Sequence, residues 1–340
     1  MFTVPVLIGI AVAGLIAILI GIILGSRKPS PEQTAERQDE TVSSTDSASK
    51  SSTSPAAPPL KAVSGGLEIR DLEERTGLSA DELRSLKPEY RVVEIAKHGG
   101  GKRRLEIPDE RTKEIQATVL RRLFSAIRSH SAACGFERAT SIVNAATPHV
   151  GRRVVIKLDI RRFFQSTTDD RVLAWFQSVG WSQEAAQLLT HLTTWDGHLP
   201  QGAPTSPRLS NLINAPLDEA LLRLAEKHKG AYTRYADDIT FSFNFRSGRR
   251  ARGIIQAARR ILRSFGYAMH GGRKLKVLRK NQRQSVLGLV VNDRIALPRH
   301  KRRWLRAVRH RRDQTGQCSL SDQQLQGWES LQQMIENQRD

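Results

Sequence analysis

The sequence is poor in cysteine and in acidic residues. Its two cysteines, Cys134 and Cys318, lie far apart and form no CxxC pair, which excludes a disulfide framework and a cysteine-rich zinc site. The 34 Asp and Glu face 54 Lys and Arg, giving a formal net charge of +20. An enzyme acting on small neutral substrates has no need of this excess, whereas nucleic acid and anionic membranes both attract it. Charge alone does not choose between these two partners.

Charged side chains are absent from residues 1–25, and residues 4–24 are almost wholly apolar. About 20 apolar residues suffice to cross a bilayer as a helix. The nearest positive charges, Arg27 and Lys28, follow this segment, whereas a cleavable signal peptide has them before it. We therefore predict a transmembrane anchor at 1–25 with the rest of the chain in the cytoplasm. A cleaved signal peptide is the alternative.

Large apolar residues are nearly absent from 26–64, which is rich in Ser, Thr, Pro and Ala. Such a segment cannot bury enough surface to offset its ordering entropy, so we predict a disordered linker. The folded part is then expected as one unit over 65–298, followed by a short basic unit over 299–340.

Four local patterns predict elements within the folded part. Residues 67–86 are typical of two short helices around a turn at Gly77, with Ser79 and Glu82 forming a capping box at the second. Residues 98–108 suggest a hairpin with a glycine-rich, basic tip. Long helices are expected over 109–130 and 206–225, from their apolar spacing.

Three acidic residues stand at the ends of apolar, β-branched runs. Residues 154–160 read as a buried strand that delivers Asp159 near its end. Asp237 and Asp238 lie between a tyrosine and an alternating strand, as in a hairpin turn. Adjacent carboxylates repel each other and are costly to bury unless a cation neutralises them. Nucleotidyl transfer with two Mg²⁺ ions about 4 Å apart needs such a carboxylate cluster.

Three strings of residues carry a family resemblance. Tyr-Ala-Asp-Asp-Ile-Thr-Phe-Ser at 235–242 resembles the central motif of reverse transcriptases, in the form typical of the bacterial retron subgroup. Asp-Ile-Arg-Arg-Phe-Phe at 159–164 resembles the first catalytic motif. Leu-Pro-Gln-Gly-Ala-Pro-Thr-Ser-Pro at 199–207, followed by Leu-Ser-Asn at 209–211, is similar to the motif between them. The resemblance covers about 67–312.

This resemblance implies an α/β fold: a right-hand polymerase palm with an antiparallel sheet, helical fingers and a short helical thumb. It implies an RNA-directed DNA polymerase that uses Mg²⁺, dNTPs and an RNA template to make DNA. The implied catalytic and metal-binding groups are three carboxylates and one backbone carbonyl: Asp159, Asp237, Asp238 and the carbonyl of Ile160.

The resemblance also implies a nucleotide site. Phe164 occupies the place of the aromatic residue beneath the sugar, whereas its neighbour Phe163 should be core. A basic hairpin tip suits a triphosphate, which Arg104 and also Lys102 are placed to contact; a solvated basic turn is the alternative. Arg273 and Lys274 compete for the cation on the pyrophosphate side. The residues expected to bind nucleotide are Arg104, Phe164, Gln201, Gly202 and Lys274.

Basic residues recur at helical spacing over 299–312, with apolar residues on another face. The pattern predicts a thumb helix that offers Arg302, Arg303, Arg306 and Arg309 to nucleic acid. A merely solvated charged face is the alternative.

The subgroup's Asn-Ala-x-x-His and Val-Thr-Gly strings, which are linked to recognition of a cognate noncoding RNA, are altered here at 144–149 and 286–288. We expect a retron-type enzyme serving phage defence, with a structured RNA and possibly an effector protein as partners. Two alternatives stay open: another bacterial reverse transcriptase group, and a catalytically idle, membrane-attached scaffold that binds nucleic acid.

Overall fold

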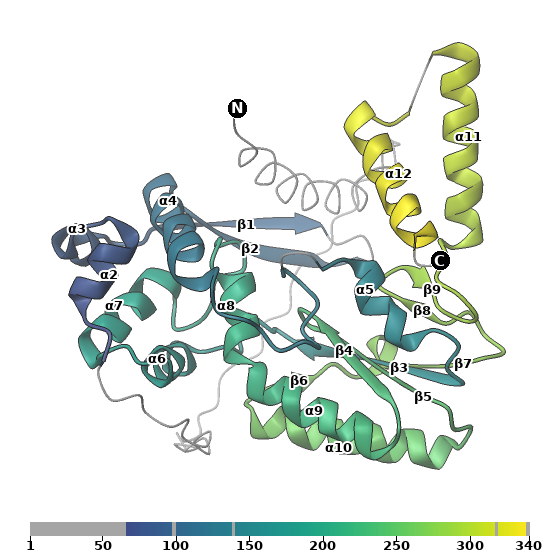
Figure 1. Cartoon of the computed structure of the whole chain (residues 1–340), viewed down its shortest axis with the longest axis horizontal. Helices are drawn as coiled ribbons and strands as arrows, with labels where there is room; N and C mark the ends of the chain where they lie inside the picture. Colours follow the sequence, from purple (N-terminus) through teal and green to yellow (C-terminus); the bar gives the residue numbers. More distant parts are fainter. Residues whose placement is uncertain (1–65, 97–99, 138–139, 317–318, 338–340) are drawn as a thin grey trace, which may run out of the picture.

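The computed structural model describes residues 66–96, 100–137, 140–316 and 319–337 (Figure 1). The predicted anchor at 1–25 and linker at 26–64 lie outside these ranges. Within them, no helix combines the length and the apolar character needed to cross a membrane.

A five-stranded antiparallel sheet forms the centre of the molecule. Its strand order is β4-β5-β3-β6, and β7 also pairs with β3. The apolar run predicted as a strand forms β3, which is buried along nearly its whole length. The antiparallel sheet agrees with the palm expected from the sequence. Its strands are β3 (Val154–Arg161), β4 (Ala231–Tyr235), β5 (Asp238–Phe243), β6 (Ala268–Met269) and β7 (Lys276–Arg279).

Successive side chains of β3 point to opposite faces of the sheet, and each face has its own apolar cluster. Ile156 and Leu158 pack with α9 (Ala215–Lys227) and α10 (Gly248–Ser264), which cover one face (Figure 1). Val155 points to the other face, into a separate cluster. That cluster is built on α5 (Ile142–Ala146), β8 (Ser285–Val286), β9 (Leu289–Val290), α11 (Arg299–Thr315) and α12 (Asp322–Glu336). A short 3₁₀ turn, η2 (Thr147–His149), follows α5.

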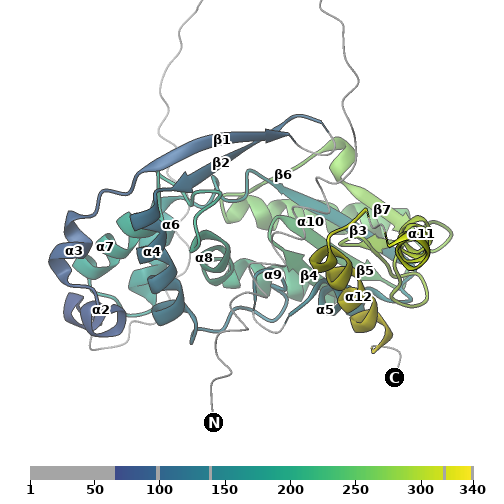
Figure 2. The same cartoon turned by 90° about the horizontal axis from the view of Figure 1, so that it is seen from above.

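A lobe of helices with its own apolar core stands at one end of the sheet. We call it the helical lobe: α2 (Ile69–Thr76), α3 (Ala80–Ser85), α4 (Glu110–Val119), α6 (Asp169–Ser178), α7 (Gln183–Thr193) and α8 (Ser206–Ile213). The capping box of Ser79 and Glu82 starts α3, as predicted. The predicted hairpin is formed by β1 (Tyr90–Ala96) and β2 (Lys102–Pro108). Figure 2 shows it running from the helical lobe along one side of the molecule.

Two predicted long helices differ from the structure. The helix expected over 109–130 is α-helical only to Val119 and then widens into a π-turn, η1 (Leu120–Phe124). The helix expected over 206–225 is two helices, because Pro216 in the first turn of α9 has no N–H to continue α8.

The basic helix predicted near the C-terminus is α11, and a second helix, α12, pairs with it. The Trp304 and Trp328 rings meet edge to face with centroids 5.6 Å apart. Lys301 lies over both rings. The sequence prediction did not include α12, whose polar, glutamine-rich sequence has few apolar positions.

Candidate active site

The three predicted carboxylates lie together where β3 meets the β4–β5 turn. Asp159 and Asp238 are direct partners in the β3–β5 register, so their side chains share one face of the sheet. Asp237 lies in the turn itself, and its carbonyl accepts a hydrogen bond from the Ile160 N–H at 2.9 Å. The N–H and C=O of a strand residue point to the same side, so the Ile160 carbonyl also faces Asp237.

A buried arginine holds the turn that carries these acids. Ala236 has a φ of 53°, a left-handed conformation that costs about 1 kcal/mol or more for a residue with a Cβ. Arg234 donates to the Ala236 carbonyl at 3.2 Å. Two further bonds, at 2.7 and 2.6 Å, join it to Asp218, and both side chains are fully buried. Arg234 also donates to Asn211, so the Leu-Ser-Asn string supports the catalytic turn.

Arg234 and Asp218 were missed by sequence reasoning. The available signal was an arginine inside the otherwise apolar and aromatic strand 231–235. A buried strand tolerates such a charge only with a partner.

Burial and mutual repulsion disfavour the ionised forms of the two turn carboxylates. Burial, then the charges of Asp159 and Asp238, raises the pKa of Asp237 to about 6. Burial is also the main cause that raises the pKa of Asp238, while Lys157 opposes the shift. One carboxylate oxygen of Asp159, Oδ1, is buried without a hydrogen-bond partner. Crowded carboxylates with an unbonded oxygen fit a hard divalent cation.

Lys274 supplies positive charge at this cluster. Its Nζ lies 2.7 Å from Oδ2 of Asp159, and the His270 N–H donates to the Asp159 carbonyl at 2.7 Å. Arg273 and Lys274 were the two candidates for the cation on the pyrophosphate side. The side chain of Arg273 lies outside the described part, whereas Lys274 lies at the Asp159 carboxylate. Among the described residues, no group of three His, Cys, Asp or Glu side chains has the arrangement of a metal site.

A buried acid that the sequence analysis missed joins the β1–β2 hairpin to the loop at 199–204. Glu106 is fully buried and accepts from the Gln201 N–H at 3.1 Å, while its own N–H donates to the Gln201 carbonyl at 3.0 Å. Gly202 has a φ of 148°, and a Cβ there would lie 2.6 Å from the Glu106 carbonyl oxygen. The glycine is thus required for this close approach.

Arg104 lies beside the same junction. Its Nε is 3.3 Å from Glu106, and its guanidinium is 5.8 Å from the centroid of the Trp195 ring. Its side chain is half exposed. Lys102, the alternative, pairs instead with Glu94 on the neighbouring strand.

The two adjacent phenylalanines have different surroundings. Phe163 is buried and its ring stacks on Tyr267 with centroids 5.6 Å apart, which confirms its prediction as core. Phe164 is only partly buried and touches the edge of both large cores. It is therefore the more accessible of the two rings.

His149, at the end of the altered Asn-Ala-x-x-His string, is a core residue. Its ring is fully buried and hydrogen-bonds to Ser242 Oγ at 2.7 Å and to Thr233 Oγ1 at 2.8 Å. Burial lowers the pKa of His149 to about 3, so the ring is neutral. This side chain braces β4 against β5 and is not accessible to RNA.

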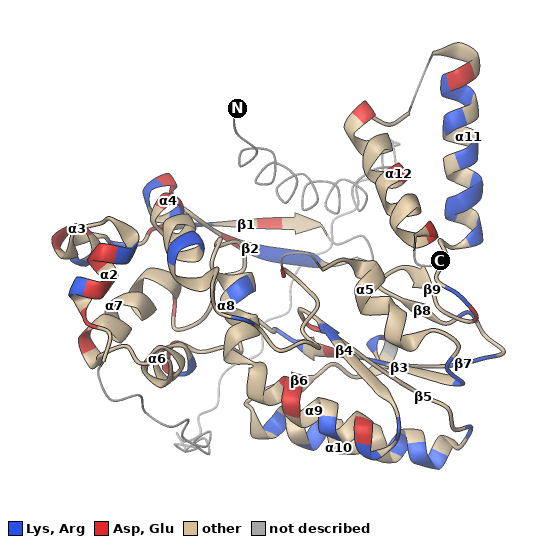
Figure 3. Cartoon of the chain, in the orientation of Figure 1, with Lys and Arg blue, Asp and Glu red and all other residues tan. Residues whose placement is uncertain are grey.

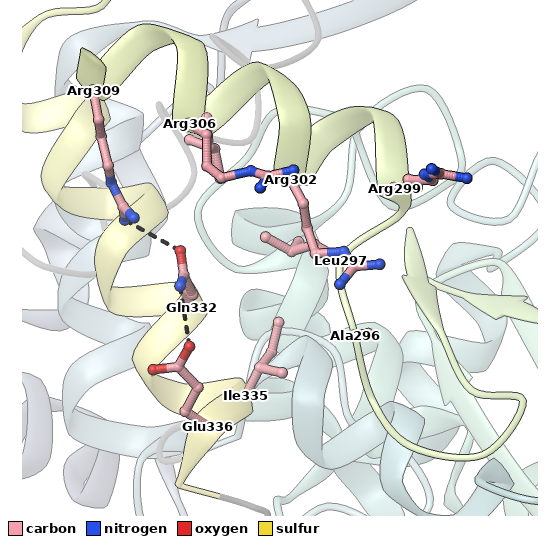
Figure 4. Close-up of a pocket in the computed structure, with 10 residues that line it drawn as sticks. Ala296, Leu297, Arg299, Arg302, Arg306, Arg309, Gln332, Ile335 and Glu336 are labelled. Atoms are coloured by element: carbon pink, nitrogen blue, oxygen red, sulfur yellow. Dashed lines mark hydrogen bonds between the residues drawn. The ribbon is translucent and has the colours of Figure 1, made fainter.

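The arginines predicted on the thumb helix line a cavity of about 390 Å³ between α11 and α12 (Figure 4). Arg302, Arg306 and Arg309 belong to its lining, whereas Arg303 does not. Arg309 connects the two helices through Gln332 at 3.2 Å and Glu329 at 3.5 Å. Within the described residues, Arg302 and Arg306 form no ion pair, which leaves their charges available to a ligand.

Comparisons with known proteins agree on one family. The model of the family "Reverse transcriptase (RNA-dependent DNA polymerase)" matches residues 95–291. The chain is 32% identical over 250 residues to the retron Ec86 reverse transcriptase of Escherichia coli, an alignment covering 71% of this chain and 77% of that protein.

Two relatives from Myxococcus xanthus are also similar. The retron Mx65 reverse transcriptase is 37% identical over 240 residues, which are 65% of this chain and 55% of the relative. The retron Mx162 reverse transcriptase is 32% identical over 298 residues, covering 75% of this chain and 61% of the relative. The chain thus spans little more than half the length of these two proteins. The family match, the antiparallel sheet and the retron relatives together establish that the chain belongs to the reverse transcriptases, RNA-directed DNA polymerases, of the retron type.

Proposed function

We propose that this chain extends a primer with deoxynucleotides on an RNA template, using Asp159, Asp237 and Asp238 as ligands of two Mg²⁺ ions. The observation that carries the proposal is the convergence of these carboxylates at the β3–β5 junction. Bound there, Mg²⁺ would activate the primer hydroxyl and stabilise the pyrophosphate leaving group.

Each acidic residue of the cluster would have its own part in holding the ions. Asp159 and Asp238, which are register partners on neighbouring strands, would hold the ions together with Asp237 from the turn and the carbonyl of Ile160. Because the pKa of Asp237 is raised to about 6, its carboxylate is mostly ionised at pH 7 but loses its charge in mild acid. A catalytically idle scaffold would have no need of such a crowded, costly cluster.

The nucleotide would lie between this cluster and the β1–β2 hairpin. Arg104 and Lys274 would bind its phosphates, and Phe164 would lie beneath the sugar and exclude a 2′-hydroxyl. Gln201 and Gly202 would pack on the base. The support for a common site is Glu106, which ties the Arg104 strand to the Gln201 loop.

We assign the helical lobe and the β1–β2 hairpin as fingers, the central sheet with α9 and α10 as palm, and the α11–α12 pair as thumb. The thumb would contact nucleic acid through Arg302, Arg303, Arg306 and Arg309. A structured noncoding RNA as template, an effector protein and a role in phage defence complete the proposal. The retron-type relatives and the net charge of +20 support the RNA partner.

We further propose that residues 1–25 anchor the enzyme in a membrane with the polymerase in the cytoplasm. The support is the uncharged apolar run followed by Arg27 and Lys28. The full-length protein should then stay in the membrane fraction after a high-salt wash. Its release by salt, or cleavage near Gly25, would overturn the anchor and leave the polymerase proposal unaffected.

Primer extension by the full-length protein in detergent tests the catalytic proposal. Extension should need an RNA template, Mg²⁺ and dNTPs, and should stop when EDTA removes the metal. Extension that continues in EDTA, or that requires ribonucleotides, would contradict it.

A further inference from the structure

One long part of the chain has no acidic residue at all. Between Asp238 and Asp293 lie 54 residues with 13 Lys and Arg and no Asp or Glu. The structure places this stretch in β5, α10, β6, η3 (Gly272–Lys274), β7, β8 and β9. Lys274 lies at the carboxylate cluster, whereas a large share of the other cations lies on α10 (Figure 3).

The arginines of α10 form a stripe along the outer face of the helix. Spacings of three, eight and three residues place four exposed arginines on the same side of the helix: Arg249, Arg252, Arg260 and Arg263. The opposite face packs on the sheet through apolar residues. At 1.5 Å per residue, the stripe is about 21 Å long.

The ion pairs of the described residues leave the charges of α10 uncompensated. Among the described residues, no α10 arginine forms an ion pair. Exposed arginines elsewhere do, as in the pairs of Arg70 with Glu74 and Arg84 with Glu184. The first turn of α10 also carries arginines and no acid, although the positive end of a helix disfavours cations. Such an arrangement is relieved by an anion from outside the chain.

A cavity of about 300 Å³ beside the start of α10 gathers further cations. Arg153 comes from the turn before β3, Arg246 from the β5–α10 connection, and Arg279 and Lys280 from the end of β7. The Arg246 carbonyl accepts a bond from Arg279 at 3.2 Å, which orients that guanidinium. Of the four, only Lys280 has an ion-pair partner in the described part of the chain, Asp293 at 3.4 Å.

This cavity is separate from the active site. It is lined by Val154, the first residue of β3, whereas Asp159 lies five residues further along the same strand. Five residues of strand span about 17 Å. A phosphate in the cavity therefore cannot belong to the nucleotide that reacts at the carboxylates.

We propose that this cavity and the α10 stripe, which we call the back-palm surface, bind the phosphate backbone of a double-helical RNA segment outside the copied region. The inference rests on the proposed RNA-templated function and adds a second contact to it. Seven of the eight cations named for this surface are arginines, whose forked guanidinium matches phosphate oxygens. A rigid duplex can lie along a straight stripe of this length. Binding through its phosphates needs no contact with the bases.

An anionic membrane is disfavoured as the ligand. A membrane-binding face usually adds exposed apolar side chains to its cations. The exposed large apolar residues of the described part are Val92, Phe136 and Met334, and none belongs to the back-palm surface.

The test compares two RNA ligands and two triple variants of the full-length protein. The ligands are a short primer–template and the same molecule with a long RNA hairpin attached. The variant R153Q/R246Q/R279Q removes three cavity charges, and R70Q/R84Q/R223Q removes three exposed arginines that are already paired with acids. Both lose the same net charge.

The wild type and the control variant should bind the hairpin ligand more tightly than the short one. The cavity variant should lose this gain in affinity. Its plot of log affinity against log salt should also be less steep, with a slope smaller in magnitude by roughly two to three units. It should still extend the short primer at the wild-type rate. A cavity triple Arg→Lys variant should recover most of the gain, which excludes misfolding.

Equal salt slopes in the two Gln variants would overturn the proposal. So would displacement of the hairpin ligand by phosphatidylserine vesicles at the cavity, because the surface would then serve a membrane. A wild type that binds the hairpin but extends no primer would refute the proposed polymerase function and leave the back-palm surface standing.

Discussion

At the scale of single residues, two adjacent phenylalanines have different roles: Phe164 is proposed to exclude a 2′-hydroxyl, and Phe163 packs in the core. Phe164→Val should open the space beneath the sugar and increase incorporation of ribonucleotides relative to deoxynucleotides. Phe163→Val, the matched control, should mainly lower stability, by about 1–3 kcal/mol, because its ring is buried against Tyr267. Competing dNTP and rNTP in primer extension measures the ratio. A change in sugar choice in Phe163→Val alone would move the proposed role to the neighbouring position.

His149 gives the folded protein a specific pH dependence. Its pKa is about 3 in the folded chain, against about 6.5 in an unfolded one. Between these values the unfolded chain binds a proton that the folded chain does not. Stability from this group is therefore complete above pH 6.5 and falls as the pH decreases, by at most about 1.4 kcal/mol per pH unit.

Urea unfolding of the full-length protein at pH 7 and pH 5 measures this loss. His149→Gln should flatten the pH dependence, whereas His191→Gln, at an exposed position, should not. NMR provides a check that needs no variant. An imidazole of His149 that titrates near pH 6.5 in the folded protein would contradict the assignment.

At the scale of elements, a buried ion pair joins α9 to the catalytic hairpin. Asp218→Asn leaves Arg234 buried without its charge partner, which should cost about 3–5 kcal/mol of stability. Asp322→Asn breaks the exposed pair with Arg312 and should cost less than about 1 kcal/mol. Denaturant midpoints of the two variants provide the comparison. Equal losses would show that Arg234 does not depend on Asp218.

Elements whose pattern is local were predictable from the sequence. The α3 capping box, the β1–β2 hairpin and β3 each follow from a few neighbouring residues, and the structure has them where expected. The break between α8 and α9 was missed, because the apolar spacing continues across Pro216. The polar α12 was missed because its packing on α11 depends on contacts between distant residues.

In the candidate active site, too, local motifs were predicted and contacts between distant residues were not. The three carboxylates proposed as catalytic were predicted from their motifs, and the pairing of β3 with β5 brings Asp159 and Asp238 together. Glu106 and Asp218 were not identified, because their burial depends on partners far away in the sequence. Arg234 was also missed, although its place inside a strand of mainly apolar and aromatic residues was a signal.

At the scale of the whole molecule, the proposed catalytic site and the cavity of the back-palm surface lie toward opposite ends of β3. The carboxylates lie where Asp159 pairs with Asp238, whereas the cavity is lined by Val154 at the start of the strand. RNA held at both would have to pass around the palm, so the enzyme would retain its template while the copied segment moves.

Removal of a single carboxylate should abolish DNA synthesis if the three acids form the catalytic centre. The measurement is the primer-extension rate of full-length Asp238→Asn on an RNA template, beside Asp81→Asn, whose side chain is almost fully exposed. Asp238→Asn should remain folded, because it removes a buried repulsion, and should lose more than about a hundredfold in rate. Asp81→Asn should extend at the wild-type rate. A folded Asp238→Asn that also extends at the wild-type rate would contradict the assignment of these carboxylates as the catalytic centre.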